Sequence, residues 1–103
     1  MPEYLTVARA KDVPPGKALT VDVEGLRIAV FNINGTYYAI ADTCPHAGAS
    51  LAEGDVDGCT VECPLHSARF DLESGAVLSP PAERNVAAYQ VRVAGDELQI
   101  QVG

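Results

Sequence analysis

Two short runs of the sequence carry the residue types that bind metal ions. They are Cys44–His46, which reads Cys-Pro-His, and Cys63–His66, which reads Cys-Pro-Leu-His, and they contain both histidines and two of the three cysteines. Thiolate and imidazole together favour zinc, copper or an iron–sulfur cluster over the hard cations, which prefer oxygen ligands. Glycine and proline flank both runs, which predicts loops rather than a helix. We therefore expect a metal site formed by two loops that face each other.

The order of the ligand types distinguishes among these metals. Two-Cys two-His zinc fingers usually keep the cysteines in one pair and the histidines in a later pair. Here the types alternate, Cys44 with His46 and then Cys63 with His66. Alternation suits a two-iron cluster in which each loop gives its cysteine to one iron and its histidine to the other, as in a Rieske [2Fe–2S] centre. A zinc site is the main alternative, since a site without metal would bring both histidines together by accident.

The resemblance extends beyond the four ligands. Cys44–Gly48 (Cys-Pro-His-Ala-Gly) and Cys63–Asp71 (Cys-Pro-Leu-His-Ser-Ala-Arg-Phe-Asp) resemble the two cluster-binding boxes of Rieske ferredoxins. The resemblance implies one [2Fe–2S] cluster as the cofactor. The metal ligands that it implies are Cys44, His46, Cys63 and His66. It places the histidines at a solvent-exposed tip, with their imidazole edges as the exit for the electron.

The surroundings of the cluster are expected to be apolar. Ser79–Ala82 (Ser-Pro-Pro-Ala) resembles the proline loop that covers a third side of the cluster in Rieske proteins, although a rigid connector would have the same composition. The side chains expected to exclude water from the sulfides are Pro45, Ala47, Leu65 and Pro81.

The same loops predict a low reduction potential. High-potential Rieske proteins carry an extra cysteine in each loop, forming a disulfide, and hydroxyl groups that bond to the sulfurs. The corresponding positions here hold Ala49, Leu65, Ala68 and Phe70. The chain thus resembles the low-potential, soluble branch, and we expect a value at the low end of the range from about −150 to +300 mV.

The third cysteine, Cys59, is expected not to be a ligand. It precedes a predicted strand residue, Thr60, and an unligated cysteine commonly behaves as a small buried hydrophobe. A redox-reactive or intermolecular thiol is the competing role.

Length and charge restrict the class of protein. A chain of 103 residues fits one domain, and it contains no apolar run of about eighteen residues and no basic or apolar leader after Met1. We expect a cytoplasmic monomer. The net charge of −7 argues against nucleic acid and anionic membranes. It favours a partner with a basic docking surface, although acidity also confers solubility. The acids nearest the loops in sequence are Glu53, Asp55, Asp57 and Glu62.

Apolar residues alternate with polar ones through most of the chain, which predicts an all-β fold. Asn34-Gly35 is a strong signal for a hairpin turn. The alternation in the closing hairpin predicts that Tyr89, Val91 and Val93 face the core. The expected strands are Tyr4–Ala8, Leu19–Val23, Leu26–Ile33, Thr36–Ala41, two short strands within 50–62, Arg69–Leu72, Tyr89–Val93 and Leu98–Val102.

The expected architecture is a single Rieske domain, residues 1–103. An antiparallel, sandwich-like scaffold (about 1–41 and 72–103) carries a cluster-binding insertion (about 42–71). The resemblance implies an electron carrier and not an enzyme, which passes one electron from a flavin-containing, NAD(P)H-dependent reductase to a terminal aromatic-ring oxygenase. The Rieske small subunit of an NADH-dependent nitrite reductase is the second interpretation, and a structural zinc-binding interaction module is the third.

Overall fold

The structure, a computed structural model, describes residues 4–44, 49–64, 68–79 and 85–101. Within these ranges eleven strands form three antiparallel sheets, so the all-β prediction is confirmed. Sheet 1 contains β1 (Tyr4–Arg9), β11 (Glu97–Gln101) and β10 (Val91–Ala94); sheet 2 contains β2 (Ala18–Val23), β3 (Leu26–Ile33), β4 (Thr36–Ala41) and β9 (Ala88–Tyr89); sheet 3 contains β5 (Asp55–Asp57), β6 (Thr60–Glu62), β7 (Arg69–Asp71) and β8 (Val77–Ser79).

Two single turns of 3-10 helix, η1 (Ala10–Asp12) and η2 (Leu51–Glu53), complete the regular structure of the described residues. Neither is long or apolar enough to cross a membrane.

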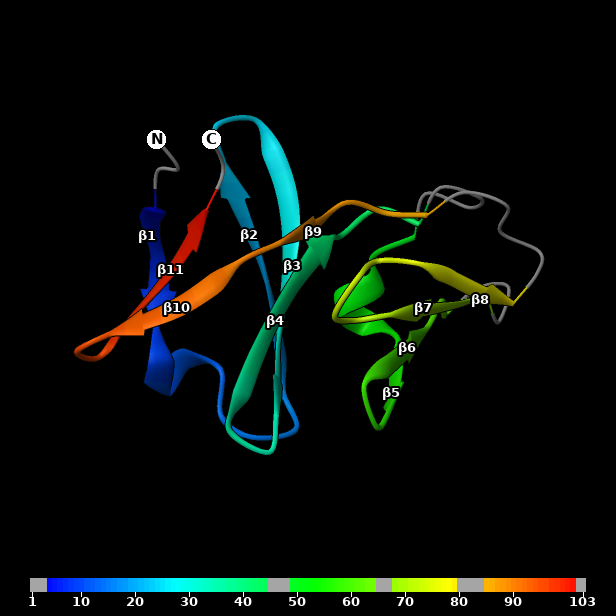
Figure 1. The fold of residues 1–103 in the computed structure, drawn as a ribbon, viewed down its shortest axis with the longest axis horizontal. Coiled ribbons are helices and arrows are strands. Elements are labelled where there is room, and N and C mark those ends of the chain that lie inside the picture. The colour runs from blue at the N-terminus through cyan, green and yellow to red at the C-terminus, as the bar shows by residue number, and fades with distance from the viewer. Residues whose placement is uncertain (1–3, 45–48, 65–67, 80–84, 102–103) are drawn as a thin grey trace.

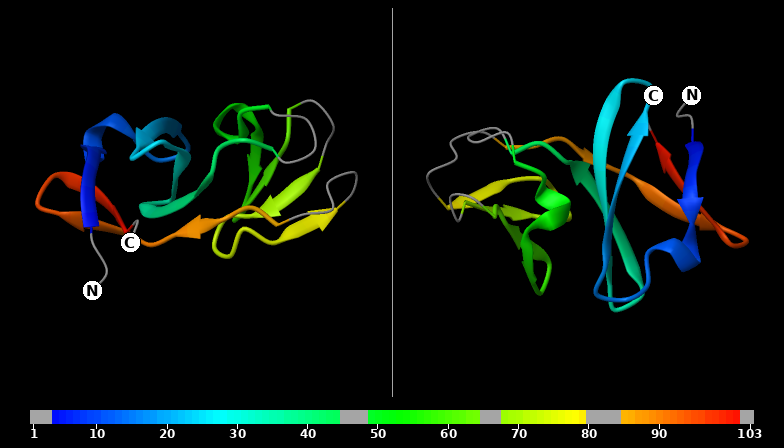
Figure 2. Two further views of the ribbon diagram at one scale, coloured as in Figure 1. Left: turned by 90° about the horizontal axis from the view of Figure 1, so that it is seen from above. Right: turned by 180° about the vertical axis from the view of Figure 1, so that it is seen from behind.

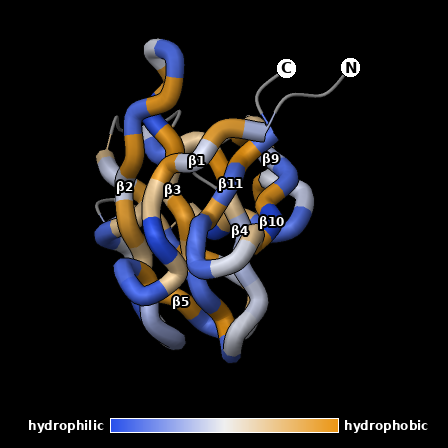
Figure 3. Tube along the Cα trace, turned by 90° about the vertical axis from the view of Figure 1, so that its left-hand side faces the viewer, coloured by the Kyte–Doolittle hydropathy of each residue, from blue (hydrophilic) through white to orange (hydrophobic). Residues whose placement is uncertain are grey.

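Sheet 2 lies between the other two sheets (Figures 1 and 2). Its strand β3 is therefore buried on both faces. Ile28 and Val30 pack into a core shared with sheet 1, whereas Ala29 and Phe31 pack into a second core shared with sheet 3. Along β2 and β11 hydrophobic and hydrophilic residues alternate, as Figure 3 shows, because each of these strands has one face turned to a core.

The predicted hairpin turn between β3 and β4 is confirmed. Asn34 and Gly35 have φ values of 53° and 93°, which is the left-handed conformation that a two-residue turn between twisted strands requires. The turn is also held by Asn32, whose side-chain oxygen accepts a hydrogen bond of 2.7 Å from the Gly35 amide. Local sequence chemistry therefore defines this part of the scaffold.

The prediction of one continuous strand from Tyr89 to Val93 is wrong. The chain pairs with β4 in sheet 2 as β9, leaves the ladder at Gln90, and then pairs with β11 in sheet 1 as β10. Tyr89 and Val91 still pack against a core, as expected, but Val93 is 49% exposed rather than in the core. A strand that turns the corner between two packed sheets commonly switches partners in this way.

Sheet 3 is a meander of short antiparallel strands that begins after η2. The predicted insertion, about 42–71, contains the first three strands, and the fourth strand, β8, follows it. One cross-strand row joins Asp55, Glu62, Arg69 and Ser79. This row marks the end of the sheet at which the chain leaves for the second predicted ligand loop.

Candidate metal centre

Both cysteines of the predicted ligand set lie in one buried cluster. Cys44 follows β4 of the scaffold and Cys63 follows β6 of sheet 3, and each is 1% exposed. They pack in the same core, which also contains Leu51 and Ala68. The structure thus brings together two thiols that are far apart in the sequence and removes both from water.

The two cysteines open loops that are closed in the same way. The Cys44 amide donates a hydrogen bond of 2.9 Å to the Ala49 carbonyl, and the Cys63 amide donates one of 2.7 Å to the Ala68 carbonyl. In each case the bond spans five residues and begins at the cysteine. The two loops are therefore structurally equivalent at their described ends, as expected for ligand loops that serve one cluster.

Pairing at their ends fixes both loops to the rest of the protein. The first loop is closed by an antiparallel bridge between Thr43 and Ser50. The second joins neighbouring strands, since Glu62 at the end of β6 pairs with Arg69 at the start of β7. That pair is reinforced by an ion pair of 3.4 Å between the Arg69 Nε and the Glu62 Oε1.

The segment that follows β8 is fixed at its base as well. The Val77 amide donates a hydrogen bond of 2.9 Å to the Asn85 side chain, and the Val86 amide donates one of 2.8 Å to the Gly75 carbonyl. These bonds attach Asn85 and Val86, which follow residues 80–84, to the turn between β7 and β8 and to the start of β8. The second loop and the segment that follows β8 therefore both leave sheet 3 at the end marked by the Asp55–Ser79 row, whereas the first loop follows β4 of sheet 2.

The remaining predicted site residues fall outside the described ranges. These are the ligands His46 and His66, the apolar neighbours Pro45, Ala47, Leu65 and Pro81, and most of the proline loop Ser79–Ala82. Within the described ranges no group of three or more His, Cys, Asp or Glu side chains is placed to hold a metal ion.

Cys59 lies in the turn between β5 and β6, half-buried against the core that contains the other two cysteines. A hydrogen bond with Cys59 raises the pKa of the Tyr38 phenol above its ordinary value, and the charge of the thiolate and desolvation act in the same direction. Tyr38 belongs to β4, so this pair connects sheet 2 to sheet 3. Both side chains are partly buried against the core that contains Cys44 and Cys63.

Sequence reasoning missed Asp42, which is 1% exposed and precedes Cys44 by two residues. Its side chain accepts hydrogen bonds from Ser50, at the far end of the same loop, and from Thr20 of β2. An aspartate at a strand end, close before a ligand run, was the only signal in the sequence.

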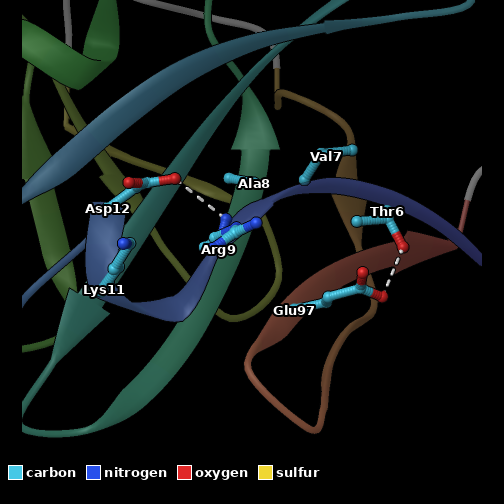
Figure 4. A pocket seen from close by; sticks show the side chains of 7 residues that line it. All are labelled: Thr6, Val7, Ala8, Arg9, Lys11, Asp12 and Glu97. Carbon is cyan, nitrogen blue, oxygen red and sulfur yellow. Dashed lines mark hydrogen bonds between the residues drawn. The ribbon is translucent and has the colours of Figure 1, made fainter.

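A shallow pocket of about 510 Å³ lies away from the cysteines, on sheet 1 and η1 (Figure 4). Its polar groups bond with one another: the Arg9 amide donates to Asp12 over 3.0 Å and the Thr6 hydroxyl donates to Glu97 over 3.2 Å. No cysteine or histidine lines it. The residues that line it are Thr6, Val7, Ala8, Arg9, Lys11, Asp12 and Glu97.

Comparison with known proteins agrees with this geometry. Residues 3–90 match the model of the Rieske [2Fe-2S] domain. The 3-phenylpropionate/cinnamic acid dioxygenase ferredoxin subunit of Escherichia coli K12 is 46% identical over 92 residues, which cover 88% of this chain and 86% of the relative. The chain therefore belongs to the Rieske [2Fe-2S] family. The buried pair of cysteines fits the cysteine half of such a cluster.

Solved structures of similar length include ferredoxins of dioxygenase systems. The ferredoxin of carbazole 1,9a-dioxygenase from Nocardioides aromaticivorans IC177 superposes with a TM-score of 0.89 at 35% identity, covering 94% of this chain and 95% of that one. A chain from the complex of reduced oxygenase and oxidized ferredoxin in carbazole 1,9a-dioxygenase gives 0.87 at 34% identity, covering 95% and 92%. A protein assigned as the small subunit of an NADPH nitrite reductase gives 0.83 at 26% identity, covering 97% and 99%.

This chain is accordingly a Rieske ferredoxin, an electron carrier. The predictions of the Rieske fold, of a [2Fe–2S] cofactor and of electron transfer as the function are confirmed.

Proposed function

We propose that this ferredoxin accepts one electron from a flavin-containing, NAD(P)H-dependent reductase and delivers it to a terminal aromatic-ring oxygenase. The main observation behind the proposal is the pair of equivalent loops that bury Cys44 and Cys63 in one core. The relatives support the choice of partners, since one is a dioxygenase ferredoxin subunit and another belongs to a complex of oxygenase and ferredoxin. The proposed setting is the cytoplasm, and the proposed unit is a monomer.

The proposed ligands are Cys44 and Cys63 on one iron and His46 and His66 on the other. When bound, the cluster supplies a one-electron couple, and two neutral imidazoles in place of thiolates make its reduction easier than in a four-cysteine cluster. The residues around the thiols exclude water, because Cys44 and Cys63 are both nearly inaccessible. The closing hydrogen bonds of the two loops hold each thiol in place before and after electron transfer.

We also propose that residues 1–103 are one Rieske domain. Its cluster-binding part would run from about residue 42 to Ser79, because β8 completes sheet 3. The scaffold would then consist of sheets 1 and 2.

A nitrite reductase small subunit remains the second candidate, because a protein assigned to that class has the same fold over nearly its whole length. The test is to reduce the purified protein and mix it with either a terminal aromatic-ring oxygenase or a nitrite reductase large subunit in a stopped-flow instrument. We expect fast, saturable reoxidation by the oxygenase. Faster reoxidation by the nitrite reductase would reverse the order of the two candidates.

The ligand assignment can be tested by substitution. Cys44→Ser, Cys63→Ser, His46→Ala and His66→Ala should each abolish the Rieske absorption and electron paramagnetic resonance spectra, because each removes a proposed ligand. Cys59→Ser is the matched control and should keep both iron content and spectrum. If a double variant that lacks His46 and His66 retained an unchanged [2Fe–2S] signal, the assignment would be disproved. A colourless wild-type protein that contains zinc would favour the structural zinc-binding interaction module.

A further inference from the structure

We propose that Asp42 is a positioning residue for the cluster. In this role it anchors the first ligand loop, and its negative charge lowers the reduction potential. The proposal rests on the ligand role of Cys44 given above. Its tests use the isolated ferredoxin, so they are independent of which protein receives the electron.

Asp42 is a charged side chain almost without access to water. It is 1% exposed, and its Oδ1 accepts hydrogen bonds from the Ser50 hydroxyl (2.8 Å), the Ala52 amide (3.1 Å) and the Thr20 hydroxyl (3.3 Å). Its Oδ2 lies 3.6 Å from the Arg27 Nε. A buried carboxylate is costly unless it is bonded in this way, so the surroundings are adapted to the charge.

The donors join both ends of the first loop to the scaffold. Asp42 stands where β4 ends and the loop begins, and Ser50 stands where the loop returns. The backbone of Asp42 is fixed too: its amide donates to the Arg27 carbonyl (2.9 Å) and its carbonyl accepts from the Leu51 amide (2.7 Å). One residue therefore ties the entry and the exit of the Cys44 loop to strands of sheet 2.

The position of the charge suggests an electrostatic effect on the cluster. Two peptide units separate Asp42 from Cys44, so their Cα atoms are at most about 7.6 Å apart. A negative charge that is shielded from water opposes the addition of an electron nearby, because the interior screens charges poorly. Arg27 offsets part of this effect, but its side chain is 64% exposed and is therefore screened by solvent.

Two substitutions change the charge in opposite directions. Asp42→Asn keeps an oxygen that can accept the bonds made to Oδ1 but removes the charge, so the midpoint potential should rise. Arg27→Gln leaves the carboxylate and its three donors in place but removes the compensating cation, so the potential should fall. Asp96→Asn, in the exposed turn between β10 and β11, removes one charge far from the cysteines and is the matched control.

A third substitution tests the anchoring role without a change of charge. Ser50→Ala removes one donor, and it should speed the loss of iron to a chelator while leaving the potential close to that of the wild type. Potentials would be measured by protein-film voltammetry, iron loss by the decay of visible absorbance, and the ligand field by electron paramagnetic resonance. A merely structural role for Asp42 would not produce shifts of opposite sign in the Asp42 and Arg27 variants.

The proposal fails if Asp42→Asn and Arg27→Gln shift the potential in the same direction, or no further than Asp96→Asn does. It also fails if Ser50→Ala loses iron at the wild-type rate. If Asp42→Asn does not fold, the sign of the Arg27→Gln shift decides the electrostatic part. An intact cluster in Cys44→Ser would instead overturn the ligand assignment, and slow reoxidation by the oxygenase would overturn the proposed partners, whatever these potentials are.

Discussion

Ala68 and Phe70 are both completely buried, and they stand next to the second proposed ligand loop, at the positions that resemble those of the hydroxyl groups in high-potential Rieske proteins. The Ala68 carbonyl closes the loop by accepting the hydrogen bond from the Cys63 amide. A hydroxyl at either position would lie in an apolar core, where it gains most from any hydrogen bond within reach. The absence of these hydroxyls is a property of single residues that should appear in the potential.

We predict a wild-type potential near the low end of the family range, about −150 mV. Ala68→Ser and Phe70→Tyr should raise it by several tens of mV, because new hydrogen bonds to the sulfurs favour the electron-rich reduced state. One hydrogen bond contributes about 0.5–1.5 kcal/mol net. For a one-electron couple, a shift of about 59 mV in the potential corresponds to a tenfold change in the equilibrium constant for reduction. Protein-film voltammetry measures the shift, with Ala29→Ser, a buried alanine of β3, as the control.

A wild-type value near the top of the range would mean that backbone amides or burial outweigh the missing hydroxyls. An equal rise of the potential in Ala29→Ser would show that any new hydroxyl in this core is sufficient to raise it.

At the scale of elements, the turn after β7 holds residues 85–87, which follow the predicted proline loop. Gly75 has a φ of 77°, and a Cβ atom there would overlap the carbonyl oxygen of Val86. The Val86 amide in turn donates to the Gly75 carbonyl. Only glycine therefore allows the two backbones to lie this close.

We predict that Gly75→Ala destabilises the protein more than Gly95→Ala does. Both glycines have a positive φ, which costs about 1–2 kcal/mol for alanine, but nothing lies within 4 Å of a Cβ at Gly95. The steric overlap at Gly75 should add about 1–3 kcal/mol. Each kcal/mol lowers the Tm by roughly 4–8 °C in a domain of this size, which thermal unfolding would resolve.

Gly75→Ala should also speed the loss of iron, since residues 85–87 must move. Equal effects of the two substitutions on Tm and on iron loss would argue against this close contact.

A second contact between elements joins Tyr38 of β4 to Cys59 in the turn of sheet 3. The hydrogen bond with Cys59 is the main reason why the pKa of Tyr38 is raised. The folded protein therefore holds this proton to a higher pH than the unfolded chain, whose tyrosines titrate at about 10. The stability that comes from the raised pKa is present below about pH 10 and is lost as the pH rises through the folded value.

We predict that Cys59→Ala returns the pKa of Tyr38 toward its ordinary value. Cys59→Ser should have a smaller effect, because it keeps a hydrogen-bonding group but lacks a thiolate. The absorbance of tyrosinate against pH measures the change, and the cluster spectrum should stay constant in both variants. An unchanged titration in Cys59→Ala would show that the two residues do not interact in solution.

At the scale of the whole molecule, acids gather on the outer face of sheet 3. The register places Asp55, Asp57, Glu62 and Asp71 on the face opposite to the buried Val61 and Phe70. Asp55 and Glu62 belong to the cross-strand row next to Cys63, whereas Asp57 lies beside the turn between β5 and β6 at the other end of the sheet. Glu62 is partly neutralised by Arg69, so Asp55 is the more available of the two near acids.

We predict that reduction by the proposed flavin-containing reductase slows as salt rises. Electrostatic steering can raise association rates by roughly 10- to 10³-fold, and the Debye length is about 8 Å at physiological ionic strength. Asp55→Asn should weaken this salt dependence more than Asp96→Asn does, because Asp96 belongs to the turn between β10 and β11, which lies at the end of the molecule away from sheet 3 (Figure 1). Stopped-flow rates that stay flat from low to high salt would leave the net charge of −7 as a matter of solubility alone.

The sequence alone determined the chemistry and the local turns. The alternating cysteines and histidines predicted the class of cluster, because ligand type and spacing are properties of short segments. The Asn34-Gly35 hairpin was predictable for the same reason, since a positive φ depends on the residues themselves. Alternating hydrophobicity predicted the strands, but it predicted neither the second buried face of β3 nor the change of sheet at Gln90.

Only the tertiary structure decided which distant residues support the site. Asp42 gains its role from Thr20 and Arg27, two residues of neighbouring strands that no local pattern connects to it. The contact of Gly75 with Val86 depends on the same kind of pairing. Burial, charge compensation and close backbone approach arise when sheets pack against each other, so they belong to pairs of segments and cannot be read from either segment by itself.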